Sequence, residues 1–164
     1  MDKQLHELEE QLRDLLAEHE AMLALVRRKR EAVRHARPNQ VSDCTTAENA
    51  HVRRIGEIET RRQHTVAAIS RAIDPAATEP MRLGRIAERV DEPRRGRLLA
   101  LQAQLMQRMQ EIQRESRIVR QAMDGLLKHV QGMVQVVAHT LGGQTYCQRG
   151  RVAAAQVSSF AATG

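Results

Sequence analysis

Apolar residues recur along most of the chain in alternating steps of three and four, the spacing of helices that bury one face. From Asp2 to about Ala36 this pattern predicts a helix roughly 50 Å long, at about 1.5 Å per residue. Pro38 and Asn39 end it, because the residue before a proline is pushed out of α geometry. His19 takes one of the missing seam positions. The apolar seam positions are Leu5, Leu8, Leu12, Leu15, Met22, Val26 and Val33.

The same spacing predicts a second helix over residues 43–73, beginning near Ser42 or Asp43, either of which can cap a helix. Asp74 and Pro75 end it. Residues 74–96 hold three prolines and two glycines, which indicates an irregular connection with room for one short helix in "MRLGRIAERV". The seam of the second helix is Val52, Ile55, Ile58, Arg62, Val66, Ile69 and Ile73.

A third helix is predicted over residues 97–139, and Gly142 with Gly143 ends it. Its positions in heptad register are Leu98, Leu101, Leu105, Met109, Ile112, Ser116, Val119, Met123, Leu126, Val130, Met133 and Val137. The residues after 141 are small and polar and lack acidic side chains, which indicates a flexible tail.

Three long helices, each with one apolar seam, predict an all-α fold, because a single seam needs another helix to cover it. We expect residues 1–141 to form an elongated antiparallel helical bundle or coiled coil, followed by the flexible C-terminal tail 142–164. The alternative is a homodimer in which the helices pair between chains.

The composition argues against a ligand pocket. Aromatic residues make up 1% of the chain, Tyr146 and Phe160 being the two, so the rings that line most small-molecule sites are missing.

The net charge of +6 makes nucleic acid a partner to consider. The basic run from Arg27 to Arg37 has no aromatic platform or reading helix beside it, and its place near a helix C-terminus already favours positive charge. Nucleic-acid binding is therefore not the function that we expect.

Residues with catalytic or metal-binding potential form no recognisable motif. No two of the seven histidines are three or four residues apart, and Cys44 and Cys147 lie far apart, as free thiols in a reducing cytoplasm would. Glu57 with Arg61 and Glu59 with Arg62 have the spacing of ordinary intrahelical ion pairs. We expect no enzyme activity, no cofactor, no metal and no membrane span.

The end of the third helix has more apolar surface than one neighbouring helix can cover. No acidic residue follows Asp124, and Gly125 and Gly132 weaken the helix by about 1 kcal/mol each relative to Ala. Adaptable methionines and a weakened helix suit a segment that docks another helix, although a buried core helix would show the same pattern. We call this set the apolar stripe: Leu126, Leu127, Val130, Met133, Val134, Val137 and Leu141.

Three segments resemble the FlgN family of flagellar type III export chaperones: "LHELEEQLRDLLAEHEAML", "ENAHVRRIGEIETRRQ" and "LLKHVQGMVQVVAHTLGGQTYCQRGRV". Tyr146 and Gly150 match the Tyr-then-Gly signature that follows the last helix in that family. The resemblance implies a cytoplasmic, non-catalytic chaperone that keeps hook-associated (junction) proteins of the hook–filament junction unpolymerised. It also implies delivery to the export apparatus, with its ATPase or gate components as further partners.

Within this resemblance we expect the apolar stripe to face the cargo, with Tyr146 as the first anchor of the tail. Two other classes stay open at this point. One is a structural coiled-coil scaffold that associates with itself and carries no cargo. The other is a nucleic-acid accessory protein that binds through the run from Arg27 to Arg37.

Overall fold

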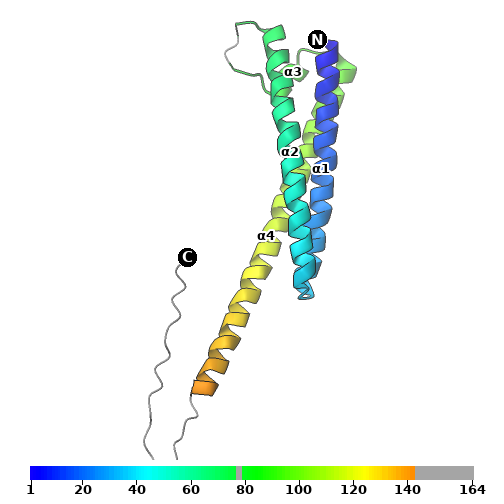
Figure 1. Ribbon diagram of the computed structural model, residues 1–164. Helices are drawn as coiled ribbons and strands as arrows, with labels where there is room; N and C mark the ends of the chain where they lie inside the picture. Colours follow the sequence, from blue (N-terminus) through cyan, green and yellow to red (C-terminus); the bar gives the residue numbers. More distant parts are fainter. Residues whose placement is uncertain (77–78, 143–164) are drawn as a thin grey trace, which may run out of the picture. The chain divides into compact units, whose positions relative to one another are not determined.

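The computed structural model describes residues 1–76 and 79–142, with side chains as far as His139. Within these residues the regular structure is entirely helical, which confirms the all-α prediction (Figure 1). The helices are α1 (Asp2–Arg34), α2 (Pro38–Ile73), α3 (Leu83–Ala87) and α4 (Glu92–Gly142). The chain divides into two units, Met1–Ala122 and Met123–Gly164, and α4 contributes to both. The predicted flexible tail lies outside the described residues.

A tight turn joins α1 and α2 into an antiparallel hairpin. Ala36 adopts a left-handed conformation with φ of 50°, and the Arg37 N–H donates to the Ala32 carbonyl at 2.9 Å. This geometry satisfies the last carbonyls of α1. Pro38 then begins α2, since its fixed φ suits the first turn and its missing N–H would have had no helical partner there. The predicted start near Ser42 or Asp43 was therefore several residues too late.

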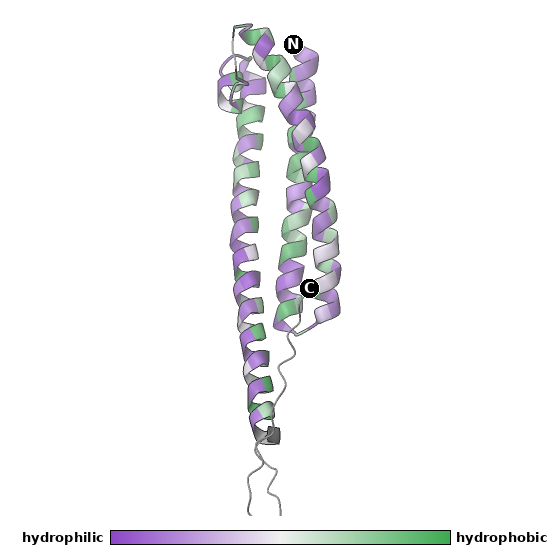
Figure 2. Ribbon diagram, turned by 60° about the vertical axis from the view of Figure 1, so that its left-hand side comes forward, coloured by the Kyte–Doolittle hydropathy of each residue, from purple (hydrophilic) through white to green (hydrophobic). Residues whose placement is uncertain are grey.

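The α1 seam is buried as the spacing predicted, and α1 and α2 pack side by side along their length (Figure 2). On α2 the buried seam positions include Ile58, Val66 and Ile69. Val52, predicted as a seam residue, is 57% exposed. The neighbouring His51 occupies the interface at this level instead, with its Nδ1 2.5 Å from a carboxylate oxygen of Glu18 on α1.

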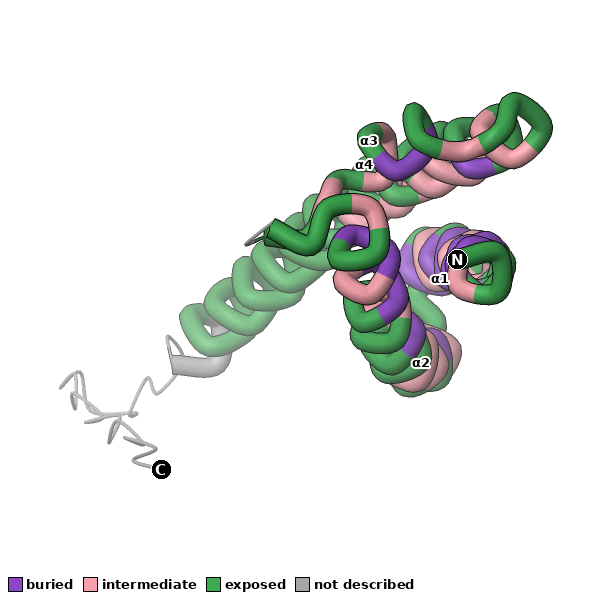
Figure 3. The backbone as a smooth tube through the Cα atoms, turned by 90° about the horizontal axis from the view of Figure 1, so that it is seen from above, coloured by how far each residue is buried: buried purple, intermediate pink, exposed green. Residues whose placement is uncertain are grey.

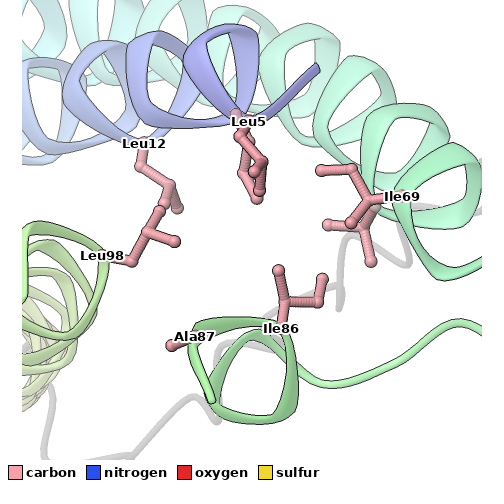
Figure 4. Packing of buried hydrophobic residues seen from close by; sticks show 8 residues of the cluster. Leu5, Leu12, Ile69, Ile86, Ala87 and Leu98 are labelled. Atoms are coloured by element: carbon pink, nitrogen blue, oxygen red, sulfur yellow. The ribbon is translucent and has the colours of Figure 1, made fainter. Parts of the chain in front are cut away.

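One end of the first unit holds a compact apolar cluster to which all four helices contribute (Figure 4). The short helix α3 inserts Ile86 and Ala87, both fully buried. The Met81 N–H donates to the Ser70 hydroxyl at 2.8 Å, which ties the connection to α2. The sequence analysis had left room for one short helix in this connection, within "MRLGRIAERV". The cluster consists of Leu5, Leu8, Leu12, Val66, Ile69, Ile86, Ala87 and Leu98.

Helix α4 begins at Glu92, five residues before the predicted position 97, with Pro93 in its first turn. Its part within the first unit packs on α1 through Leu98, which is fully buried, and through Val119. Ion pairs reinforce this contact: Arg97 donates to both carboxylate oxygens of the buried Glu9 at 3.2 Å, and Arg30 donates to Glu115 at 2.8 Å. The first unit is thus a helical assembly in which α4 is held by both apolar and charged side chains.

Candidate partner-binding surface

The described members of the apolar stripe all lie on the surface of the second unit. Their exposed fractions range from 43% for Val130 to 62% for Val134. Every described side chain from Met123 to His139 is exposed, and this part of α4 is uniformly green in Figure 3. The described members of the predicted set are therefore exposed in this structure.

Helical spacing explains why the stripe is broad. Leu126, Val130, Met133 and Val137 follow one another in steps of four, three and four, which is the narrow seam of a coiled coil. Leu127 and the residue seven further on, Val134, lie beside this seam and widen it. Two neighbouring rows of apolar side chains can cover a larger face of an incoming helix than a single row can.

Val136 also belongs to this surface, although the sequence-based set leaves it out. It is 63% exposed and lines a hollow of about 590 Å³ together with Met133 and Val137. The hollow forms around Gly132, whose missing side chain leaves the helix surface open, and Lys128 and His129 complete its lining.

The two glycines of this segment are not required by close packing in the structure. A Cβ built on Gly125 or on Gly132 would meet no atom within 4 Å. No described neighbour therefore comes close enough to either position to require the absence of a side chain there.

Two predicted partner-binding residues cannot be placed in the same way. Leu141 lies in the last turn of α4, but its side chain is outside the described set. Tyr146 lies wholly outside the described residues, as does Cys147.

The basic run after Arg27 is engaged in ion pairs with other helices. Arg27 pairs with Glu111 at 3.5 Å, Lys29 with Glu48 at 2.8 Å and Arg30 with Glu115. Two of these glutamates belong to α4 and one to α2, so the run helps to join the helices of the first unit. Glu111 also receives hydrogen bonds from Gln107 and Arg108, and together these donors hold the pKa of its carboxyl below its usual range.

Polar residues of α2 form ion pairs both within α2 and with α1. The predicted pair Glu59–Arg62 forms, with contacts of 2.6 and 2.8 Å, and it lowers the pKa of Glu59 and raises that of Arg62. Hydrogen bonds from His51 and Arg54 lower the pKa of Glu18. For each of these shifts the largest cause is a hydrogen bond to a neighbouring side chain.

No set of three His, Cys, Asp or Glu side chains is grouped as metal ligands would be in the part of the chain that the structure describes. Cys44 is a buried free thiol. Among the described helices, none has a stretch sufficiently long and apolar to cross a membrane.

The sequence model of the FlgN protein family matches residues 1–154. No curated protein and no solved structure matches the chain. The family match covers all four helices, including the whole of the apolar stripe. The chain belongs to the FlgN protein family, a family of flagellar export chaperones.

Proposed function

We propose that the chain is a cytoplasmic chaperone of hook–filament junction proteins and that it binds them through the end of α4 and the C-terminal tail. The supporting observation is the exposed apolar stripe, which lies within the region matched by a family of export chaperones. Covering the cargo's apolar helix prevents premature polymerisation and keeps the cargo ready for delivery to the export apparatus, whose ATPase or gate components are further proposed partners.

The physical basis is a helix-against-helix contact. An amphipathic helix of the cargo lays its apolar side on the stripe, with contacts repeating every three or four residues. Met133 at the centre of the stripe can repack around different side chains, which suits a chaperone for more than one junction protein. Leu141 and Tyr146 are included in the proposed cargo site on the basis of the sequence alone.

The test is a pair of double variants that add the same charge to opposite sides of α4. Leu126→Asp with Val130→Asp places two carboxylates on the stripe. Gln121→Asp with Gln135→Asp places two carboxylates at exposed positions on the opposite face of the helix. Calorimetric titration with a purified junction protein should show loss of binding for the first variant and near wild-type affinity for the second.

Circular dichroism on both variants checks the fold, which should be retained because all four positions are exposed. If the Leu126→Asp, Val130→Asp variant is folded and still binds the junction protein, the stripe is not the cargo site. If wild-type protein associates with itself but with no junction protein, the chain is a scaffold and the proposed function is wrong.

A further inference from the structure

The contact between α1 and α4 in the first unit begins with carboxylates on α1 and arginines on α4. The two helices run in the same direction there, so early residues of α1 meet early residues of α4 (Figure 1). An Arg94 nitrogen lies 2.7 Å from an Asp2 oxygen. The Glu9 side chain is 4% exposed, with Arg97 at 3.2 Å and Arg94 at 3.7 Å. Glu9 is thus a buried carboxylate whose partners include two arginines of α4.

The polarity of these pairs reverses farther along the contact. Arg108 of α4 pairs with Glu20 of α1 at 3.4 Å, with the same polarity as the earlier pairs. Beyond it the cations belong to α1: Arg30 pairs with Glu115 of α4 at 2.8 Å, and Arg27 lies 3.8 Å from the same carboxylate. Positive and negative charges therefore follow one another along each helix in an order that is specific for one alignment of the two helices.

The apolar seam of α4 is less specific, because it repeats at intervals of seven residues. Its members at this spacing are Leu98, Leu105, Ile112, Val119 and Leu126. Consider a displaced register in which α4 has moved along α1 by one heptad, about 10 Å. Every seam position would again hold an aliphatic side chain, with Leu126 in the place of Val119. Apolar packing by itself therefore permits the displaced register.

The charges oppose the displaced register along the whole contact. Glu115 would take the place of Arg108 and face Glu20, which sets two carboxylates against each other. The buried Glu9 would meet Gln104 in place of an arginine, and a buried charge that loses its partner is costly. The two arginines near the end of α1 would lose their carboxylates as well.

We propose that the ion pairs between α1 and α4 fix the register of α4, so that Val119 and not Leu126 packs among the valines and the methionine of the second cluster on α1. That cluster holds Met22, Val26 and Val33 with Val119. Exposed ion pairs add little stability on their own. Pairs of reversing polarity nevertheless discriminate between alignments, because the wrong one brings like charges together.

This register has a consequence that rests on the proposed function. Leu126 is the first residue of the apolar stripe and is 45% exposed. The displaced register would bury it on α1, so the chaperone would cover the start of its own cargo site. By opposing that register, the ion pairs keep Leu126 exposed for cargo. The fixed register itself does not depend on the cargo.

The substitution Glu115→Arg tests the proposal because it acts on the two registers in opposite directions. In the native register the new cation faces Arg30, whereas in the displaced register it faces Glu20. Adding Arg30→Glu exchanges the charges of the native pair and should restore the native register, as expected for a directly coupled pair. Arg117→Glu is the control, at an exposed position on the other face of α4.

Double electron–electron resonance on the full chain measures the register. Spin labels are attached at Ala17→Cys on α1 and Gln121→Cys on α4, both exposed positions of the first unit. Cys147→Ser removes the thiol of the tail, and Cys44 is buried. Gln121 lies farther along the contact than Ala17, so the displaced register brings the labels closer together, by up to about 10 Å.

Wild type and the Arg117→Glu control should show one distance, and Glu115→Arg a second, shorter one. The exchanged variant should return to the first distance. An unchanged distance in Glu115→Arg overturns the proposal, as does an exchanged variant that keeps the shorter distance. Circular dichroism covers a failure to fold: helicity lost in Glu115→Arg and regained by the exchange supports the proposal, whereas loss in both overturns it.

Titration with a junction protein separates this inference from the proposed function. Glu115→Arg should bind the junction protein at least about tenfold more weakly, the effect of losing an important interface residue, and the exchanged variant should bind like wild type. Unchanged binding in the displaced register would contradict a role of Leu126 in the cargo site and leave the register proposal intact. A native distance in Glu115→Arg would overturn the register proposal and leave the proposed function intact.

Discussion

Helix α4 contains two halves with the same apolar spacing and opposite surroundings. In the first half, Leu98 is fully buried and Val119 nearly so, and both pack in clusters with residues of α1. In the second half, Leu126 and Val130 occupy equivalent seam positions and are exposed. The comparison shows that heptad spacing alone does not determine whether a seam is buried by other helices of the same chain.

The two halves of α4 also differ in their charged side chains. Arginines and glutamates of the first half form ion pairs with α1, whereas the second half has no acidic residue after Asp124. Ion pairs set the position of the first half against its own neighbours. Among the described residues of the second half, Asp124 is the one acidic side chain, so charge contributes less to this half than to the first.

The largest expected effect comes from truncating one leucine in each half. Leu98→Ala removes a fully buried side chain and should lower the free energy of unfolding by about 2–5 kcal/mol. Leu127→Ala, at an exposed position, should change it by less than about 0.5 kcal/mol while weakening cargo binding. Urea denaturation of both variants measures the difference. Equal losses of stability would mean that the stripe is part of the folded core.

A second test removes the charge that anchors the first half. The Glu9 side chain is 4% exposed and pairs with Arg13 at 3.1 Å and with Arg97 at 3.2 Å. Glu9→Gln should lower the free energy of unfolding by about 2 kcal/mol, the scale of a hydrogen bond to a charged group. Glu10→Gln, at the exposed neighbouring position, is the matched control and should have little effect. A neutral result at Glu9 would show that apolar packing alone holds α4 on α1.

Acid should affect the first unit more than the second. The pKa of Glu18 is lowered below 4.5 by hydrogen bonds from His51 and Arg54, so its stabilising contribution is complete above pH 4.5 and is lost as the pH falls below that value. Asp2, Glu59 and Glu111 in the same unit have lowered pKa values as well. Asp124 is the one acidic residue described in the second unit.

Hydrogen exchange between pH 5 and 3 followed by mass spectrometry measures this difference. Peptides of α1 and α2 should lose protection, and Glu18→Gln should reduce the pH dependence by on the order of 1 kcal/mol. Peptides from residues 123–139 should show little change once the intrinsic effect of pH on exchange is corrected. An equal loss of amide protection in both units would contradict the expected difference in their sensitivity to acid.

The smallest expected effect concerns the glycines of the second half. Gly125→Ala and Gly132→Ala meet no neighbouring atom and should stabilise the local helix by about 1 kcal/mol or less each. Amide exchange over residues 123–139 should slow accordingly, whereas the same change at Gly56 should stabilise α2. Reduced stability at Gly132 would reveal a close contact that only glycine permits.

The sequence by itself determined the helices and the positions of their seams. Alternating steps of three and four identified every buried seam residue named in α1, because helical geometry places such residues on one face irrespective of what covers them. The same reasoning located the apolar stripe and the short helix α3. It missed Pro38 as the start of α2, since a proline both ends one helix and begins another.

Tertiary structure decided which seam positions are covered. Val52 and Met109 fit the spacing and are exposed, whereas the carboxylate of Glu9 is buried because arginines from two helices surround it. The apolar cluster around Ile86 arises only where four helices meet, so no single segment encodes it. Periodicity is a property of one helix, but burial depends on its neighbours, and these were visible only once the chain was folded.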